Sequence, residues 1–325
     1  MEHACLAGWT PVFAAIQAGE LMVDWGDLGD LRFSDPFFDQ TVERWAGGNP
    51  PPELRRTGAE ALEALDGEPS LDPDGIICHL SRCGSTLLSR QLASVPGMVV
   101  ASEPGPINAL LLQGAGQWPP ARLAEALRLM VRAIGRRRHG DERHFVLKLS
   151  SWNIRQLTIF RRAFPGIPVV WVQRAPLAVA TSLLDAPAGW MQPGQSAAMA
   201  DAVFGPALPA LAAPDDLCLR ALAALLTAAR EAAHTGRFLA VDYRELPAAA
   251  WSRVAPFLNL PLDATVVARM VEEARYDAKE PGRRPFAGSA KRAVPNRVRA
   301  LVARHLTPLY EEVGGLADSA KVAST

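Results

Sequence analysis

The chain has 325 residues, 49% of them hydrophobic, so it is long enough to bury a sizeable core. Its 34 basic and 34 acidic side chains balance, which removes any overall attraction to nucleic acid or anionic membranes. The N-terminus lacks a signal-peptide pattern, and no apolar run approaches the roughly 18 residues that a transmembrane helix needs. We therefore expect a cytoplasmic protein that neither binds nucleic acid nor inserts into membranes. Its richness in Ala, Arg and Pro suggests a bacterial source.

The four cysteines, Cys5, Cys78, Cys83 and Cys218, are widely spaced and form no CxxC pair. This spacing argues against a structural zinc site and against a disulfide framework.

Residues 1–70 are expected to form an irregular and helical lead-in that packs on a main domain spanning 71–325. Four aromatic side chains, Phe33, Phe37, Phe38 and Trp45, cluster in its centre, and we interpret them as packing residues. The punctuating stretch 47–52, GGNPPP, precedes a predicted charged helix over Glu53–Leu65.

From Asp74 onward, short apolar runs alternate with amphipathic segments. The predicted strands are Gly75–Leu80, Met98–Ala101, His144–Ser150, Pro168–Gln173 and Arg237–Tyr243. The predicted helices are Ser85–Ser94, Arg122–Arg138, Trp152–Ala163, Leu177–Leu184 and Leu217–Thr235. A segment rich in Pro, Gly and Ala, Ala186–Pro214, is predicted to be a loop or lid. Alternating strands and helices favour an α/β fold with a central parallel sheet flanked by helices.

The stretch HLSRCGST, residues 79–86, joins the first of these strands to a helix. A turn of this kind presents unpaired N–H groups to an anion, and the helix dipole assists. Gly84 allows close approach, Ser85 and Thr86 add hydroxyl donors, and Arg82 can bind two oxygens of a phosphate or sulfate. The alternative is an ordinary turn with a serine cap.

The ATP-binding pattern GxxxxGK[ST] is not met, because no lysine follows Gly84. Asp242 is the only candidate for an acidic strand end that could hold Mg²⁺. Kinase chemistry is thereby weakened, although it stays open.

This loop resembles the first motif of the sulfotransferases, P-[KR]-S-G-[ST]-[ST], with Ser81 in place of the proline and Cys83 in place of the serine. The resemblance implies a three-layer P-loop fold and transfer of a sulfuryl group from 3′-phosphoadenosine 5′-phosphosulfate (PAPS), with adenosine 3′,5′-bisphosphate as product and no metal. It implies that the backbone of residues 82–86, Cys83 included, binds the donor. The arginine form of the motif is that of the tyrosylprotein and bacterial branches.

A second motif supports the resemblance. VVWVQRAPLAVATSL contains Arg174 at a strand end and Ser182 on the next helix, 182 − 174 = 8 residues later. This is similar to the family's 3′-phosphate motif, and physically it is another anion site at a strand-to-helix turn. The alternative is an arginine that only caps a strand end.

Two softer matches follow. The segment Leu239–Asp263 resembles the family's Y-E-x-L element and places Tyr243 near the nucleotide. The segment RRPFAGSAKR resembles the loop that closes over PAPS, with Arg283, Arg284, Ser289 and Lys291 as its candidates. A solvated basic turn is the alternative for each of them. The whole resemblance spans about Asp74 to Arg292.

Sulfuryl transfer needs cations at the leaving group and a base at the acceptor hydroxyl. Arg82 and Lys148 are the predicted catalytic cations, and a lysine within an apolar strand needs a partner. The histidine of the family's K-x-H element is missing, since Leu149 and Ser150 follow Lys148. The resemblance to the tyrosylprotein branch makes Glu103 the predicted base, 103 − 82 = 21 residues after an Arg82 that could orient it. A solvent-exposed turn acid is the alternative.

Two further side chains near the loop are interpreted differently. His79 is expected to be a structural histidine. Cys83 lies among N–H groups that would lower the pKa of its thiol, so a thiolate nucleophile is conceivable. The residue that stacks on adenine is not identified, and Trp152 is the substitute considered.

The main hypothesis is a PAPS-dependent sulfotransferase with Glu103 as general base. The alternatives are an ATP-using P-loop kinase and a degenerate nucleotide-binding module that acts through protein contacts. The acceptor could be a small molecule, carbohydrate or peptide that carries a hydroxyl group, and a homo-oligomer is left open.

Overall fold

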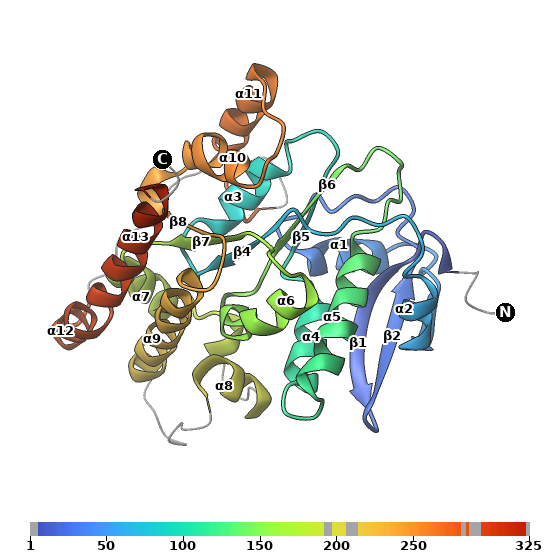
Figure 1. Ribbon diagram of the computed structural model, residues 1–325, viewed down its shortest axis with the longest axis horizontal. Helices are drawn as coiled ribbons and strands as arrows, with labels where there is room; N and C mark the ends of the chain where they lie inside the picture. Colours follow the sequence, from blue (N-terminus) through green and yellow to red (C-terminus); the bar gives the residue numbers. More distant parts are fainter. Residues whose placement is uncertain (1–5, 192–196, 206–213, 281–283, 286–293, 323–325) are drawn as a thin grey trace.

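The computed structural model describes residues 6–191, 197–205, 214–280, 284–285 and 294–322. Its larger sheet has five parallel strands in the order β5-β6-β4-β7-β8 (Figure 1). The strands are β4 (Gly75–His79), β5 (Met98–Ser102), β6 (His144–Lys148), β7 (Val169–Gln173) and β8 (Phe238–Asp242). Helices cover both faces of this sheet, so the predicted α/β fold with a central parallel sheet is confirmed.

The strand order indicates which edge of the main sheet is expected to bind a ligand. The chain extends the sheet on one side of β4 with β5 and β6, and then crosses over to add β7 and β8 on the other side. In open parallel sheets, ligands bind outside the carboxyl ends of the strands at such a reversal. The strand-terminal residues at this edge are His79, Ser102, Lys148, Gln173 and Asp242.

Two apolar clusters pack against the two faces of the sheet. One joins alternate strand residues such as Ile77 and Val172 to α3 (Ser85–Leu92), to the π-helical turn η5 (Ala250–Val254) and to α11 (Ala264–Glu273). The short α10 (Ala255–Phe257) lies with them (Figure 1). The other cluster joins Cys78 and Trp171 to the opposite layer, which holds α4 (Gly105–Gly114), α5 (Pro120–Ile134), α6 (Leu157–Ala163), α7 (Pro176–Asp185) and α9 (Pro214–Ala233). The strands are therefore apolar on both faces, as their nearly continuous hydrophobic runs predicted.

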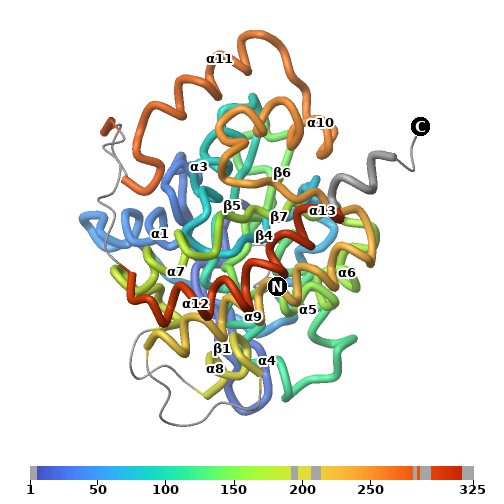
Figure 2. The backbone as a smooth tube through the Cα atoms, turned by 90° about the vertical axis from the view of Figure 1, so that its left-hand side faces the viewer, coloured from blue at the N-terminus to red at the C-terminus, as the bar shows by residue number. Residues whose placement is uncertain are grey.

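The remaining elements complete the two layers. The C-terminal helix α13 (Thr307–Val322) lies against β8 and α9 and follows α12 (Asn296–His305) (Figure 2). Short 3₁₀ helices η2 (Ser151–Gln156), η3 (Gly189–Met191) and η4 (Tyr243–Glu245) connect elements near the sheet. Among the described residues, no helix is both long and apolar enough to cross a membrane.

The N-terminal region differs from its prediction. It holds a three-stranded antiparallel sheet of β1 (Thr10–Gln17), β2 (Glu20–Gly26) and β3 (Leu54–Gly58), with helices α1 (Phe38–Ala46) and α2 (Glu60–Ala64). The predicted helix over Glu53–Leu65 is wrong in its first half. Pairing of β3 with β2, including the ion pair between Arg56 and Asp24, overrides the weak helical preference of a charged sequence.

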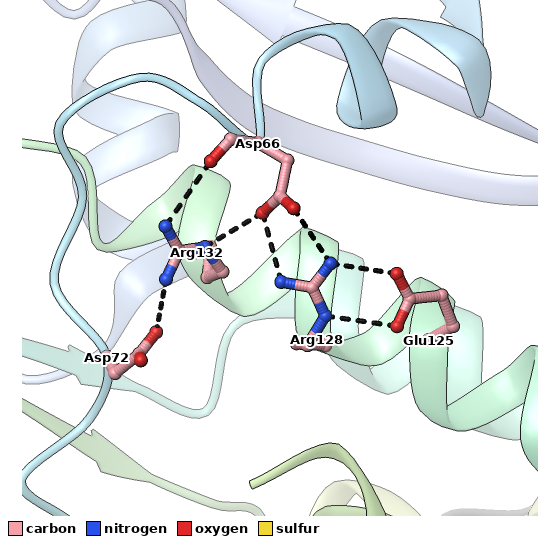
Figure 3. A network of polar contacts seen from close by, with 5 residues as sticks. All are labelled: Asp66, Asp72, Glu125, Arg128 and Arg132. Carbon is pink, nitrogen blue, oxygen red and sulfur yellow. Dashed lines mark hydrogen bonds and ion pairs between the residues drawn. The ribbon is translucent and has the colours of Figure 1, made fainter.

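The N-terminal region shares a hydrophobic core with the layer of α4 and α5. Ion pairs add to this contact (Figure 3). Asp66, after α2, binds Arg128 and Arg132 of α5 at 2.9 Å each, and Arg132 also reaches Asp72 at 2.6 Å. Arg128 in turn binds Glu125 at 2.8 Å. Packing and charge thus hold residues 6–72 on the main sheet, while a domain boundary near residue 70 stays a prediction.

The segment Ala186–Pro214 was predicted as a loop or lid. Its described part contains η3 and the helix α8 (Ala197–Phe204), which packs on α9 and η2. Arg155 donates to the carbonyls of Asp201 and Ala202 and so fixes the end of α8. The high content of Pro and Gly hid this short helix from the sequence pattern.

Candidate active site

The turn between β4 and α3 has a strained backbone that opens toward the carboxyl edge of the sheet. Ser81, Arg82 and Gly84 have positive φ values of 71°, 47° and 88°. A non-glycine residue in this conformation costs of order 1–3 kcal/mol and is concentrated at functional sites. Among the described residues no side chain caps the start of α3, where the first N–H groups of a helix have no partner within the helix. These groups can bind an anion, as the sequence predicted for residues 82–86.

Residues that were predicted to bind the nucleotide lie close to Gly84. A Cβ atom at this position would lie 2.8 Å from the ring of Tyr243, so the ring packs directly on the turn. The guanidinium of Arg174 lies 4.4 Å from the centre of the same ring. Ser182 is half-buried in the second turn of α7, the helix that begins just after Arg174. The ends of β7 and β8 thus lie beside the anion-binding turn.

Glu103 follows β5 directly and has a φ of 54°. Its Oε1 atom forms an ion pair with Lys148 Nζ, and its Oε2 accepts a hydrogen bond from Ser150 Oγ at 3.2 Å. Its N–H donates to the carbonyl of Lys148 at 2.7 Å. Asn108 of α4 donates to the carbonyl of Glu103 at 3.3 Å and to Ser150 Oγ at 3.0 Å. Residues of β6, the segment after it and α4 therefore hold both the backbone and the carboxylate of Glu103 in place.

The Lys148–Glu103 pair sets the charge of the carboxylate. Burial by itself raises the pKa of Glu103, but the Lys148 charge and the adjacent His79 lower it more, so the pKa lies well below its usual range. The Lys148 side chain is 0% exposed and that of Glu103 is 25% exposed. The lysine thus has the partner that its place in an apolar strand required. The carboxylate is ionised at neutral pH.

Arg82 does not orient Glu103 as expected. Its Nη2 donates instead to the carbonyl of Ala186 at 2.7 Å. Because Ser81 and Arg82 adopt left-handed conformations, the side chain of Arg82 leaves the turn on the side of α7. It remains half-exposed at the edge of the site.

His79, which was expected to be a structural histidine, lies between the turn and Glu103. Its Nδ1 accepts a hydrogen bond from Ser81 N–H at 3.0 Å, and its Nε2 lies 3.4 Å from Glu103 Oε1. Burial and then the Lys148 charge lower the pKa of the imidazole more than Glu103 raises it, so the ring is neutral near pH 7. One ring therefore contacts both the anion-binding turn and the carboxylate. The signal in the sequence was a titratable residue at the end of an otherwise apolar strand.

The thiol of Cys83 is not a candidate nucleophile. It is fully buried and donates to the carbonyl of Val172 at 3.1 Å. Burial raises the pKa of Cys83 to about 11, although nearby backbone N–H groups act in the opposite direction. The thiolate nucleophile that the sequence left conceivable is therefore corrected to a buried thiol.

Two side chains of the N-terminal region reach the site, which the sequence pattern did not indicate. The ring of Phe37 lies 5.0 Å from Lys148 Nζ. Asp39 accepts a hydrogen bond from Gly105 N–H at 3.1 Å. Partial burial is the largest of the effects that raise the pKa of Asp39, and the negative charge of Glu103 is another. The neighbouring Phe38 does pack in the core, so the aromatic cluster has both packing and site members.

The basic segment near the C-terminus is described only in part. Ser289, Lys291 and Arg283 lie outside the described residues. Arg284 is described and lies 3.8 Å from Glu280. Lys279 is a further cation near the site, which the sequence did not predict. Desolvation lowers its pKa most, and the nearby charges of Arg82 and Lys148 lower it further.

Two cavities flank the carboxyl edge of the sheet. One of about 540 Å³ lies beside α3 and is bordered by Phe33, Ser34, Arg90 and Ser102, the last directly before Glu103. The other, about 560 Å³, is bordered by residues of β7, β8 and α13, among them Gln173, Asp242, Arg244 and Tyr310.

Two candidates are corrected by their surroundings. Trp152, considered for stacking on adenine, is 3% exposed and belongs to the core. Asp242, considered as a Mg²⁺ ligand, accepts hydrogen bonds from Arg244 at 2.8 Å and from the hydroxyl of Tyr310. Burial and this carboxylate raise the pKa of Tyr310 to about 12. Asp242 is thus engaged in a local network at the end of β8.

Comparison with known proteins gives a sparse result. No family model matches the chain, and no curated protein matches it. Three similar solved structures are described as sulfotransferases, each 16% identical to this chain: STF9 from Mycobacterium avium, STF1 from Mycobacterium tuberculosis and the sulfotransferase domain of the Synechococcus olefin synthase. They cover 76%, 64% and 78% of this chain and 78%, 73% and 96% of their own, with TM-scores of 0.45, 0.42 and 0.42.

These structures belong to the class that the sequence motifs resemble.

Proposed function

We propose that the protein transfers a sulfuryl group from PAPS to a hydroxyl acceptor. The observation that carries the proposal is the meeting of an anion-binding turn with a carboxylate–ammonium pair at one edge of the sheet. His79 joins them, since its ring contacts both Ser81 and Glu103. In-line transfer to a hydroxyl needs both parts close together, namely donors for the leaving phosphate and a base for the acceptor.

The donor would lie across the carboxyl ends of β4 and β7. The N–H groups at the start of α3, which no side chain caps among the described residues, and the hydroxyls of Ser85 and Thr86 suit its 5′-phosphate. Arg174, fixed over the ring of Tyr243, and Ser182 suit its 3′-phosphate. The contact between Tyr243 and Gly84 supports the idea that one nucleotide spans both anion sites.

In the proposed reaction the acceptor oxygen attacks sulfur as the bond from sulfur to the 5′-phosphate oxygen breaks. The electron pair of that bond remains on the phosphate oxygen, which Lys148 and Arg82 would stabilise. The acceptor proton passes to Glu103. A carboxylate that is already ionised can accept this proton, and Ser150 and Asn108 keep it in place.

The acceptor would approach from the side of the N-terminal region. Phe37 borders Lys148 there, and the cavity of about 540 Å³ begins beside Ser102, next to Glu103. This space suits a small molecule or one residue of a carbohydrate or peptide. The acceptor class stays open between these three.

The kinase alternative has less support in the site. Ser85 occupies the position of the P-loop lysine, and Asp242 is engaged by Arg244 and Tyr310. Lys148, the buried cation near the turn, is paired with Glu103. A binding module without catalysis would have no need to hold Glu103 in a strained conformation.

Calorimetric titration tests the proposal. Adenosine 3′,5′-bisphosphate is titrated into the wild type, into Arg174→Ala and into a control, Arg304→Ala, whose arginine is exposed on α12. We expect micromolar binding that falls about tenfold or more only in Arg174→Ala, since a hydrogen bond to a charged group contributes about 1.5–3 kcal/mol. ATP with Mg²⁺ is the comparator. Binding of ATP without binding of the bisphosphate would contradict the proposal and favour a kinase.

A further inference from the structure

Two donors approach one oxygen atom in the site. Glu103 Oε1 is paired with Lys148 Nζ, and His79 Nε2 lies 3.4 Å from the same atom. That distance exceeds the 2.7–3.2 Å typical of N–H···O hydrogen bonds. Within the described structure, Nε2 is buried and makes no hydrogen bond. His79 Nε2 therefore lies near Glu103 Oε1, while Lys148 Nζ is already paired with that oxygen.

The tautomer of His79 follows from its other nitrogen. Nδ1 accepts from Ser81 N–H, so in the neutral ring the proton is on Nε2. The Nε2–H group lies beside Glu103 Oε1, with 3.4 Å between the nitrogen and the oxygen, but without the geometry of a hydrogen bond. A buried donor without a partner costs about 1–3 kcal/mol, which gives this N–H a strong tendency to bind Oε1 once that oxygen is released.

Lys148 has two tasks that conflict. In the proposed reaction its ammonium neutralises the leaving phosphate, yet in the free protein it is paired with Glu103. While the pair is intact, Glu103 is a weak base, because the ammonium favours the ionised carboxylate. A full catalytic cycle therefore calls for a partner that can hold Glu103 when Lys148 turns away.

We infer that His79 is that partner: when Lys148 turns toward the donor phosphate, the Nε2–H of His79 takes over Oε1 of Glu103. This inference rests on the proposed function. The exchange replaces the charged ammonium of Lys148 by the neutral Nε2–H of His79 as the donor to Oε1. The hydrogen bond from Ser150 to Oε2 is kept. Glu103 keeps its orientation and gains basicity at the stage when it must accept a proton. His79 thus acts as a positioning residue.

The surrounding charges fit this exchange. Besides Lys148, two described charged groups interact electrostatically with Glu103, namely Asp39, which accepts a hydrogen bond from the start of α4, and Lys279. Neither forms a hydrogen bond or ion pair with His79 among the described contacts. Ser81, with its φ of 71°, ties the ring to the anion-binding turn, so an anion there would also fix the position of the ring.

NMR spectroscopy of the 15N-histidine-labelled protein tests the inference. The chain has six histidines, and the His79 signals are assigned by their loss in His79→Gln and His79→Asn. In the free wild type we expect the Nε2–H tautomer. On addition of adenosine 3′,5′-bisphosphate, the Hε2 signal should move downfield and its exchange with water should slow by about tenfold, as a new hydrogen bond requires. The Nδ1–H tautomer, or an unmoved Hε2 with the bisphosphate bound, would overturn the inference.

Lys148→Met separates this inference from the proposed function. Removing the ammonium frees Oε1 without any ligand, so above the carboxyl titration range Hε2 should already show the downfield shift and slow exchange. Glu103→Gln with the same ligand is the matched control, because it removes the anionic acceptor and should abolish most of the shift. If the bisphosphate fails to bind but Lys148→Met shows the shift, the proposed function fails and the exchange of donors stands. If Lys148→Met does not fold, the titration of the wild type decides.

The variants at His79 add a binding readout. His79→Asn can still accept from Ser81 but cannot reach Glu103, whereas His79→Gln can place an N–H near the position of Nε2. We expect both to bind the bisphosphate within about threefold of wild type, and PAPS turnover to fall at least tenfold further in His79→Asn than in His79→Gln. Equal loss of turnover in both, together with weakened binding, would indicate a structural role and contradict the inference.

Discussion

The ring of Tyr243, together with the side chain of Leu246, occupies the space that a side chain on Gly84 would need. A Cβ at Gly84 would come within 2.8 Å of Tyr243 Cδ2, and the φ of 88° at this glycine already disfavours any other residue. The anion-binding turn and the end of β8 are therefore fitted to each other.

Gly84→Ala should lose both stability and ligand binding. The left-handed backbone costs an alanine about 1 kcal/mol, and the contact with Tyr243 adds roughly 1–3 kcal/mol. Gly140→Ala is the matched control, since Gly140 has a φ of 80° and open space around it. Urea denaturation and bisphosphate titration measure both variants. Equal destabilisation by the two changes would refute the contact with Tyr243 as the cause.

Glu103→Ala should destabilise the protein by roughly 3 kcal/mol at neutral pH, because it leaves the fully buried Lys148 without its partner. Glu231→Gln, at an exposed carboxylate on α9, should change the free energy of unfolding by less than about 0.5 kcal/mol. Chemical denaturation gives both values. A loss for Glu103→Ala as small as that of the control would show that Lys148 finds another acceptor.

The same pair predicts a pH dependence of stability. The folded pKa of Glu103 is lowered, so its contribution is present above the unfolded carboxyl pKa of about 4.3 and is lost as pH falls below it toward the folded pKa. Denaturation midpoints measured from neutral to acid pH should fall less steeply for Glu103→Gln than for wild type. Parallel curves for the two proteins would contradict the lowered pKa.

The Cys83 thiol should resist alkylation in the native protein and react after unfolding. Burial raises its pKa to about 11, so almost no thiolate forms at pH 8, and its surroundings exclude the reagent. The experiment uses a Cys5→Ser background, and Cys78, which is also buried, serves as internal control. Cys83→Ala should bind the bisphosphate like wild type. Rapid native labelling at Cys83 would restore the thiolate hypothesis.

Asp66→Asn should destabilise the protein by about 1 kcal/mol, because it removes one carboxylate from two partly buried arginines (Figure 3). Arg128 holds the pKa of Asp66 below its usual range, which agrees with a stabilising contact. Glu125→Gln, which affects a more exposed partner of Arg128, should cost less than about 0.5 kcal/mol. Both losses should shrink at high salt. An unchanged midpoint for Asp66→Asn would mean that apolar packing alone holds the N-terminal region.

The sequence predicted the main sheet well, because parallel strands buried on both faces leave continuous apolar runs such as VVWVQ in β7. The resemblance to the sulfotransferase motifs implied that Arg174, Tyr243 and Gly84 lie near one nucleotide, and the structure brings these three residues together. The sequence pattern missed β3, whose residues Leu54–Gly58 pair through charged side chains rather than an alternating apolar pattern. The roles of His79 and Phe37 depend on contacts between distant segments, which spacing along the chain does not encode.

Glu103, the proposed base, directly follows β5, an outer strand of the main sheet, and the chain next to it comes from residues 33–39. Phe37 and Asp39 thus form part of the wall around Glu103, although they precede the sheet in the chain. Under the proposed function, substitutions at Phe37 and Asp39 are expected to change which acceptors react, with little effect on binding of adenosine 3′,5′-bisphosphate at the turn.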